Sequence, residues 1–332
     1  MREATGAREA GESRGDASSP DRRLTDRGTA DSLLPVTHLT DTHLHLWDRS
    51  GGGYGWLEGA PEALRRDARW DEVAPQHAAL GTTRVVLVQA DDTLEDTRAM
   101  QVSAERIESL PGSVDQVDVV AWLPLADPVR TAALLDDAAA MRRVVGVRHL
   151  VHDDPDPGFL DRPEVRESLA LLAGRGLPLD VPDAFPRHLD QAKRLAGEVD
   201  DLVVVLDHLG KPPLGDAPEM ARWEQALRGF AGRATTVAKL SGLSTSGQGY
   251  AAVEDLRAAV DLALDLFGPE RLMFGSDWPI APVPFDLGSG TGDLLALLAE
   301  LPDADRELVL HGTAERVYRR AADDRPWPSL SP

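Results

Sequence analysis

Two histidines separated by one residue, His43 and His45, stand in the run Asp41-Thr42-His43-Leu44-His45. Side chains alternate along a β-strand, so in a strand these two imidazoles share one face while Leu44 points to the other. Imidazoles arranged in this way can converge on one metal ion or on one oxygen of a substrate. The competing interpretation is a pair of polar residues on a half-exposed strand. The apolar opposite face favours a functional site.

Two further apolar runs end in ionisable residues, Asp207-His208 in one and Asp277 in the other. A carboxylate at an apolar strand end is costly unless it binds a metal, pairs with a charge or acts as a base. The structural alternative is capping of backbone amides, but the proline-rich residues after Trp278 do not favour a helix that Asp277 could cap. We expect catalytic roles for His43, His45, His208 and Asp277, which are also the candidate ligands of a metal ion.

Other strand ends carry Gln89, Arg148 and Lys239. Arg148 can hold a carboxylate or polarise a carbonyl in catalysis, and its structural alternative is an ion pair with an Asp of a neighbouring strand. His149 lies on the opposite face of a regular strand, so only one of these two side chains can point inward. Substrate contacts are expected from Gln89 and Lys239. Aromatic residues are candidates for a pocket wall or for core packing, and those expected to touch the substrate are Trp47, Trp122 and Trp278.

The elements that must position these residues repeat along the chain. Eight short apolar runs, many of them β-branched, alternate with longer Ala- and Leu-rich amphipathic stretches, and successive runs lie about 30 residues apart. The runs are Leu39–Trp47, Thr83–Ala90, Val117–Leu125, Val144–Val151, Leu177–Val181, Leu202–Leu209, Thr236–Leu243 and Arg271–Trp278. This repeat predicts an α/β fold, a (β/α)8 TIM barrel, whose chemistry lies at the carboxyl ends of the strands.

A doubly wound open sheet is the main competing fold. It is disfavoured because no Gly-x-Gly-x-x-Gly turn follows the first strand. Helix signals separate the runs: Asp127-Pro128 predicts a helix start that continues over Thr131–Met141, and Gly268 predicts a helix end.

The predicted organisation is a single barrel domain over residues 37–322. A polar N-terminal tail, expected to be disordered, covers residues 1–36, and a C-terminal tail covers residues 323–332. Between the first run and the next helix, the long segment Asp48–Arg69 is the expected lid or pocket wall. His38, His77, His188 and His311 fall in the tail or in helical stretches and receive no role.

Composition excludes several functions. The 35 basic and 56 acidic residues give a net charge of −21, which disfavours binding to nucleic acid or to anionic membranes. There is no Cys, so thiolate chemistry is absent and a metal would need His and carboxylate ligands, which favours zinc or manganese. We expect a cytoplasmic protein whose partner is a small-molecule substrate, and the oligomeric state stays open.

Five motifs together resemble the amidohydrolase-related barrel hydrolases. They are Asp-Thr-His-Leu-His-Leu-Trp-Asp, Gly-Val-Arg-His, Leu-Asp-His-Leu-Gly-Lys-Pro, Lys-Leu-Ser-Gly-Leu and Phe-Gly-Ser-Asp-Trp-Pro, in this order. The chain is most similar to the branch with L-fuconolactonase and L-rhamnonolactonase, and 2-pyrone-4,6-dicarboxylate lactonase is more distant. The resemblance covers residues 39–320 and implies a TIM barrel that opens a lactone ring with an activated water. Asp277 matches the family's general base.

Two departures from the family pattern bear on the chemistry. Metal-dependent relatives have a further His at the end of strand five, where this chain reads Leu177-Pro178-Leu179-Asp180-Val181-Pro182-Asp183, so a metal-free mechanism stays open beside one divalent ion. Near the C-terminus the family pattern Gly-x-Asn-Ala-x-Arg-x-Tyr has Thr313 in place of Asn. We expect Thr313 to act as a helix N-cap.

Three functions therefore compete. The first is a hydrolase that opens a small lactone of a sugar acid or a related lactone, with Asp277 as general base. The second is a metal-dependent decarboxylase or amide hydrolase on the same barrel. The third is a barrel that binds a ligand without turning it over, which the set of strand-end residues disfavours.

Overall fold

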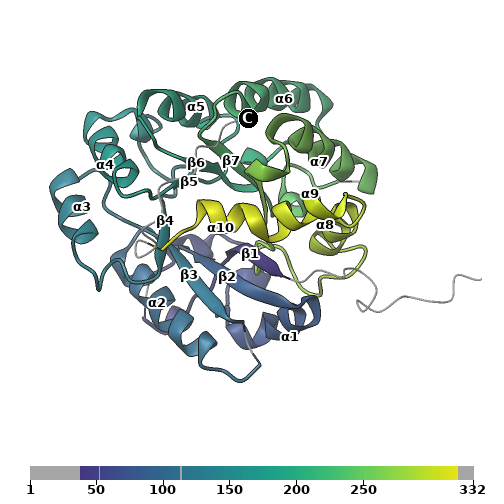
Figure 1. The fold of residues 1–332 in the computed structure, drawn as a ribbon, viewed down its shortest axis with the longest axis horizontal. Coiled ribbons are helices and arrows are strands. Elements are labelled where there is room, and N and C mark those ends of the chain that lie inside the picture. Colours follow the sequence, from purple (N-terminus) through teal and green to yellow (C-terminus); the bar gives the residue numbers. More distant parts are fainter. Residues whose placement is uncertain (1–37, 52, 113, 251, 321–332) are drawn as a thin grey trace, which may run out of the picture.

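A computed structural model describes residues 38–51, 53–112, 114–250 and 252–320. The tails expected at residues 1–36 and 323–332 lie outside these ranges. Eight parallel strands run in the order of the sequence, and a bridge between Leu44 and Trp278 brings the first strand to the last (Figure 1). They are β1 Leu39–Leu44, β2 Thr82–Val88, β3 Gln116–Ala121, β4 Val144–Arg148, β5 Leu179–Val181, β6 Val204–Leu206, β7 Thr236–Leu240 and β8 Leu272–Phe274. The predicted TIM barrel is confirmed.

Helices follow the strands and surround the barrel. They are α1 Trp70–Leu80, α2 Leu94–Glu108, α3 Pro128–Leu135, α4 Pro163–Ala173, α5 Leu189–Glu198, α6 Ala217–Ala231, α7 Val253–Phe267, α8 Gly290–Leu298, α9 Asp303–Glu307 and α10 Thr313–Val317. Asp127 caps α3 by accepting the N–H of Arg130, as its sequence predicts. The expectation that this helix continues to Met141 is wrong, because it ends at Leu135.

Most strands are shorter than the apolar runs that predict them. β6 ends at Leu206 and β8 at Phe274, whereas their runs continue to Leu209 and Trp278. The chain turns out of the sheet at both points, and His208 and Asp277 lie on these turns with positive φ angles of 55° and 59°. Strand alternation therefore does not set the direction of these two side chains.

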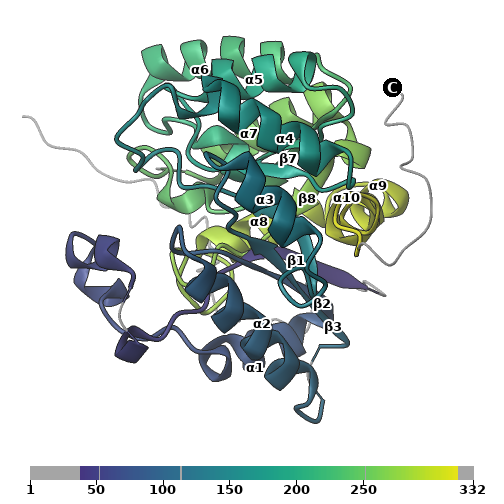
Figure 2. The same cartoon turned by 90° about the vertical axis from the view of Figure 1, so that its left-hand side faces the viewer.

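The C-terminal helix closes one end of the barrel. Its residues Ala314 and Val317, with Tyr318 just after it, are buried in one cluster with inward-facing valines such as Val88 and Val120. Figure 1 shows α10 lying across the strands, and Figure 2 shows it from its end beside them.

The predicted N-cap role of Thr313 is wrong. Gly312 before it already has helical backbone angles, and a π-helical turn over Leu308–Gly312 joins α9 to α10 without a break. The Thr313 hydroxyl instead donates to the carbonyl of Pro269 at 3.0 Å.

The segment between β1 and α1 stands out from the barrel, on the left in Figure 2. Its base is closed by paired backbone hydrogen bonds between Trp47 and Ala68. The Tyr54 hydroxyl donates to Asp96 at 2.7 Å and the Trp56 indole donates to the carbonyl of Ala90 at 2.7 Å, so two aromatic side chains fasten it to the barrel. Among the described residues, no helix combines the length and apolar character needed to span a bilayer.

Candidate active site

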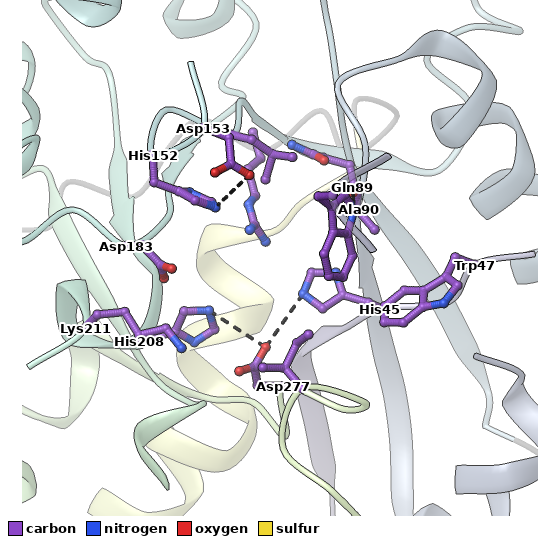
Figure 3. Close-up of a pocket in the computed structure, with 14 residues that line it drawn as sticks. His45, Trp47, Gln89, Ala90, His152, Asp153, Asp183, His208, Lys211 and Asp277 are labelled. Atoms are coloured by element: carbon purple, nitrogen blue, oxygen red, sulfur yellow. Dashed lines mark hydrogen bonds and ion pairs between the residues drawn. The ribbon is translucent and has the colours of Figure 1, made fainter. Parts of the chain in front are cut away.

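A cavity of about 200 Å³ opens at the carboxyl ends of the strands. Figure 3 shows the side chains that line it, with His45, His208 and Asp277 around its floor. The lining residues are His45, Trp47, Trp56, Gln89, Ala90, Arg148, Leu150, His152, Asp153, Asp183, His208, Lys211, Asp277 and Ile280.

Six of the residues expected at the site line this cavity: His45, Trp47, Gln89, Arg148, His208 and Asp277. His43 lies directly behind the floor and is fully buried. His149 points elsewhere, as the alternation with Arg148 predicts. Its ring stacks on Phe159 with the ring centres 3.9 Å apart.

Three expected substrate contacts are placed differently by the structure. Trp122 does not line the cavity, because its indole donates to His149 at 3.3 Å. Trp278 is buried in the hydrophobic core. Lys239 is 0% exposed, and its ammonium lies against Asp180 at 2.6 Å. None of the three lines the cavity, so the structure gives none of them a substrate contact.

The catalytic candidates converge on a single atom. The Oδ1 atom of Asp277 lies 3.6 Å from Nε2 of His45 and 3.8 Å from Nε2 of both His43 and His208. The Nε2 atoms of His43 and His45 are 3.1 Å apart. Three imidazoles, one on β1 and two from the residues that follow β1 and β6, thus surround one carboxylate oxygen from the turn after β8.

A backbone carbonyl sets the tautomer of His45, and two donors lie against the ring of His43. His45 Nδ1 donates to the carbonyl of Val88 at 2.8 Å, so the neutral ring has its lone pair on Nε2. Arg148 Nη1 lies 3.1 Å from Nε2 of His43, and the ammonium of Lys239 lies 3.1 Å from Nδ1. The His43 ring is therefore held between an arginine and a lysine.

Burial and charge determine the protonation states. Burial lowers the pKa of His43 and His208, which are therefore neutral at pH 7. Burial by itself raises the pKa of Asp277, but His208, His45 and Lys211 outweigh it and hold that pKa well below its usual range. At neutral pH the site therefore contains an ionised Asp277 beside neutral His43 and His208.

The backbone brings β1 and β8 together at the site. Oδ1 of Asp41 accepts the N–H of His43 at 3.0 Å and the N–H of Ser276 at 2.8 Å. The N–H of Asp277 donates to the carbonyl of His43 at 2.7 Å. These bonds fix Asp277 relative to His43, although the two residues are far apart in the sequence.

Gly242, just after β7, lies against the catalytic carboxylate. Its φ is +56°, and a Cβ built on it would lie 2.2 Å from Oδ2 of Asp277. Any other residue would push this carboxylate out of place.

The donor set fits a divalent metal ion. Ligand atoms around tetrahedral zinc at about 2.0–2.1 Å are about 3.3 Å from one another. The distances among His43 Nε2, His45 Nε2 and Asp277 Oδ1 range from 3.1 to 3.8 Å. This trio is therefore a candidate metal centre.

Several lining residues escaped the sequence analysis. Lys211 and Asp183 follow β6 and β5, with positive φ angles of 62° and 43°. His152 and Asp153 lie in the loop after β4, and burial lowers the pKa of His152. Their position in loops at the carboxyl ends of the strands is the signal that could have identified them.

Comparison with known proteins agrees with this geometry. The family model described as Amidohydrolase matches residues 40–320. A curated L-fucono-1,5-lactonase of Burkholderia multivorans is 32% identical over 84% of this chain and 95% of the relative. One of Burkholderia ambifaria is 30% identical over 88% of this chain and 98% of the relative.

A solved structure of an amidohydrolase from Burkholderia multivorans, with bound zinc, has a TM-score of 0.73 to this chain. It is 28% identical and covers 84% of this chain and 98% of its own. The relatives support lactone hydrolysis in general. This chain belongs to the amidohydrolase family and is a hydrolase of the amidohydrolase superfamily.

Proposed function

We propose that the protein opens the ring of a small sugar-acid lactone by adding water, with Asp277 as general base. The observation that carries this proposal is the convergence of three imidazoles on one ionised carboxylate at the floor of a ring-sized cavity. The two relatives that act on L-fucono-1,5-lactone support the substrate class.

The reaction divides into two proton transfers around one carboxylate. A water beside Oδ1 of Asp277 gives its proton to that atom while its oxygen attacks the lactone carbonyl. The negative charge that develops on the carbonyl oxygen needs a donor, and Arg148 on the cavity wall provides a permanent one. When the ring C–O bond breaks, the leaving alkoxide takes the proton from Asp277. The product is the hydroxy acid, and Asp277 returns to its ionised form.

The low pKa of Asp277 makes it a weak base towards free water, so the water itself must be made more acidic. A divalent ion held by His43, His45 and Asp277 would supply that acidity, because metal coordination lowers the pKa of bound water to near neutral. The zinc bound in the amidohydrolase from Burkholderia multivorans supports zinc as this ion.

The cavity walls suit a sugar ring. Trp47, Trp56 and Ile280 offer apolar surface, and Asp183 and Lys211 offer acceptors and donors for hydroxyl groups. An aromatic wall opposed to polar groups can hold the C–H face of a sugar lactone while its hydroxyls are hydrogen-bonded.

The test is an assay of the purified chain against a panel of aldonolactones and muconolactones. Acid release is followed with a pH indicator, and zinc is measured in the same preparation. Turnover of at least one aldonolactone supports the proposal. Release of CO2 from an aromatic acid, or tight lactone binding without acid release, would replace it with a decarboxylase or a binding protein.

A further inference from the structure

One acid on the cavity wall has no partner of its own. Asp183 lines the cavity and is partly buried, but no hydrogen bond or ion pair joins its side chain to any other residue that the structure describes. The other acids of the lining are paired: Asp153 lies 3.6 Å from Nε2 of His152, and Asp277 lies among the histidines of the floor. A partly buried carboxylate without a partner is costly unless a ligand supplies one.

The backbone fixes Asp183 in the turn after β5. Its φ of 43° lies in the left-handed region, where Asp and Asn are tolerated better than most residues. The next residue, Ala184, is 0% exposed, and the N–H of Phe185 donates to the carbonyl of Gly210 in the turn after β6 at 2.9 Å. The carboxylate is therefore presented by a turn that is tied to the neighbouring turn of the barrel.

Space for a ligand atom remains beside this carboxylate. Figure 3 shows Asp183 between His152 and His208, on the side of the cavity opposite Trp47. Burial lowers the pKa of His152, and the negative charge of Asp183 opposes this shift, so the two side chains are neighbours although no hydrogen bond joins them. A ligand oxygen that enters between them can lie at hydrogen-bond distance from both.

The two cations of the cavity wall have other partners. The Lys211 ammonium donates to the Thr245 hydroxyl at 3.0 Å, and Nε of Arg148 lies 3.6 Å from Oδ2 of Asp207. A carboxylate only accepts hydrogen bonds, so Asp183 can bind an O–H group and repels a second carboxylate. An acid at this position therefore discriminates between a hydroxylated neutral ring and a ring that carries a carboxylate.

We propose that Asp183 is a specificity-determining residue of the cavity, which accepts a hydrogen bond from a ring hydroxyl of a neutral polyhydroxy lactone and repels lactones that carry a carboxylate on this side. The proposal rests on the proposed function, because it concerns the same cavity, and it narrows the substrate class. The apolar surface of Trp47 on the opposite side is left to the C–H face of the ring.

The first test measures kcat/KM on the aldonolactone that the wild type turns over best and on lactones that each lack one of its ring hydroxyls. Asp183→Gly removes the carboxylate at a φ that glycine adopts freely. The matched control is Asp201→Gly, since Asp201 is an exposed residue outside the cavity with a φ of 59°.

A hydrogen bond to a charged acceptor contributes a factor of about ten or more. In the wild type and in Asp201→Gly, one deoxy lactone should therefore be poorer than the full lactone by about that factor, and in Asp183→Gly this penalty should nearly disappear. A merely structural role would lower turnover of all these lactones alike. If every deoxy lactone has the same penalty in Asp183→Gly as in the wild type, the proposal is overturned.

The second test concerns the charge of Asp183. Asp183→Asn keeps the shape of the side chain and tolerates the same backbone angle, and Asp201→Asn is its control. A muconolactone, which carries a carboxylate, is added as an inhibitor of aldonolactone hydrolysis. We expect it to inhibit Asp183→Asn at a concentration about tenfold lower than it inhibits the wild type and Asp201→Asn. Equal inhibition of all three proteins would refute the repulsion.

A failure of the proposed function shows itself separately, as the absence of acid release from every lactone by the wild type. The role of Asp183 is then measured by calorimetry, with a cyclic polyol ether that lacks the carbonyl and cannot be hydrolysed. We expect binding to Asp183→Gly to be about tenfold weaker than binding to the wild type and Asp201→Gly. Equal affinities, or no binding to any of the three, would overturn the proposal.

Discussion

Replacing Gly242 by alanine should disable the site without altering any residue that lines the cavity. Gly242 follows β7 with a φ of +56°, which disfavours any side chain. A Cβ at this position would lie 2.2 Å from Oδ2 of Asp277 and 2.8 Å from Nδ1 of His208, where ordinary contacts begin at 3.4 Å. The carboxylate must therefore move by about 1 Å.

Two costs add in this variant. The left-handed backbone costs about 1–2 kcal/mol for a residue with a Cβ. Crowding a packed site costs about 1–3 kcal/mol more. The free energy of unfolding should therefore fall by about 2–5 kcal/mol. A displacement of about 1 Å of a reacting group costs about 100-fold in rate, so kcat/KM on the lactone should fall by about that factor.

Gly81→Ala is the matched control. Gly81 ends α1 with a φ of +67°, and a Cβ there meets nothing within 4 Å. Gly81→Ala has the same backbone cost but no clash. Its free energy of unfolding, measured with urea, should fall by about 1–2 kcal/mol while kcat/KM stays unchanged. If Gly242→Ala keeps a kcat/KM within twofold of Gly81→Ala, the placement of Asp277 against Gly242 is wrong.

Three further predictions concern pH, the cavity wall and metal binding. Burial raises the pKa of Asp96 from 3.8 to about 6, so its contribution to stability is full below pH 3.8 and is lost as the pH rises to about 6. Between pH 4 and 7 the free energy of unfolding of the wild type, measured with urea, should therefore fall by up to about 3 kcal/mol relative to that of Asp96→Asn. If the unfolding free energies of the two proteins change in parallel with pH, this prediction is wrong. Trp56→Ala should raise KM about tenfold with kcat little changed, because it removes apolar wall, whereas a fall in kcat at constant KM would contradict that role. His45→Gln should lower the zinc bound per chain, measured by atomic absorption, while His188→Gln outside the cavity should not, and equal zinc in both would exclude His45 as a ligand.

Much of the fold could be predicted from the sequence because buried parallel strands are apolar on both faces. The run Val203-Val204-Val205-Leu206 has no other stable place than a covered sheet. What the pattern could not show is where each strand stops. An apolar run continues through Leu209, but the backbone leaves the sheet after Leu206 and then turns through four consecutive residues with positive φ, 208–211.

Site residues could be predicted where a polar side chain stands in an apolar stretch of the sequence, as His45 and Asp277 do. They could not be predicted where the function of a side chain depends on contacts across the barrel. Lys239 looks like a substrate contact from its strand-end position, but Asp180 and Asp207 on neighbouring elements draw it inward. Lys211 and Asp183 lie in turns, where no periodic pattern shows the direction of a side chain.

The most direct test of the central claim is kcat/KM of Asp277→Asn on the lactone that the wild type turns over best. The amide keeps the size of the side chain but cannot accept the proton of the attacking water. Asp293→Asn, a buried acid outside the cavity, is the control. Removing a general base costs about 100- to 10,000-fold, so the account predicts a loss of that size in Asp277→Asn and none in Asp293→Asn. Equal turnover by Asp277→Asn and the wild type would contradict the account.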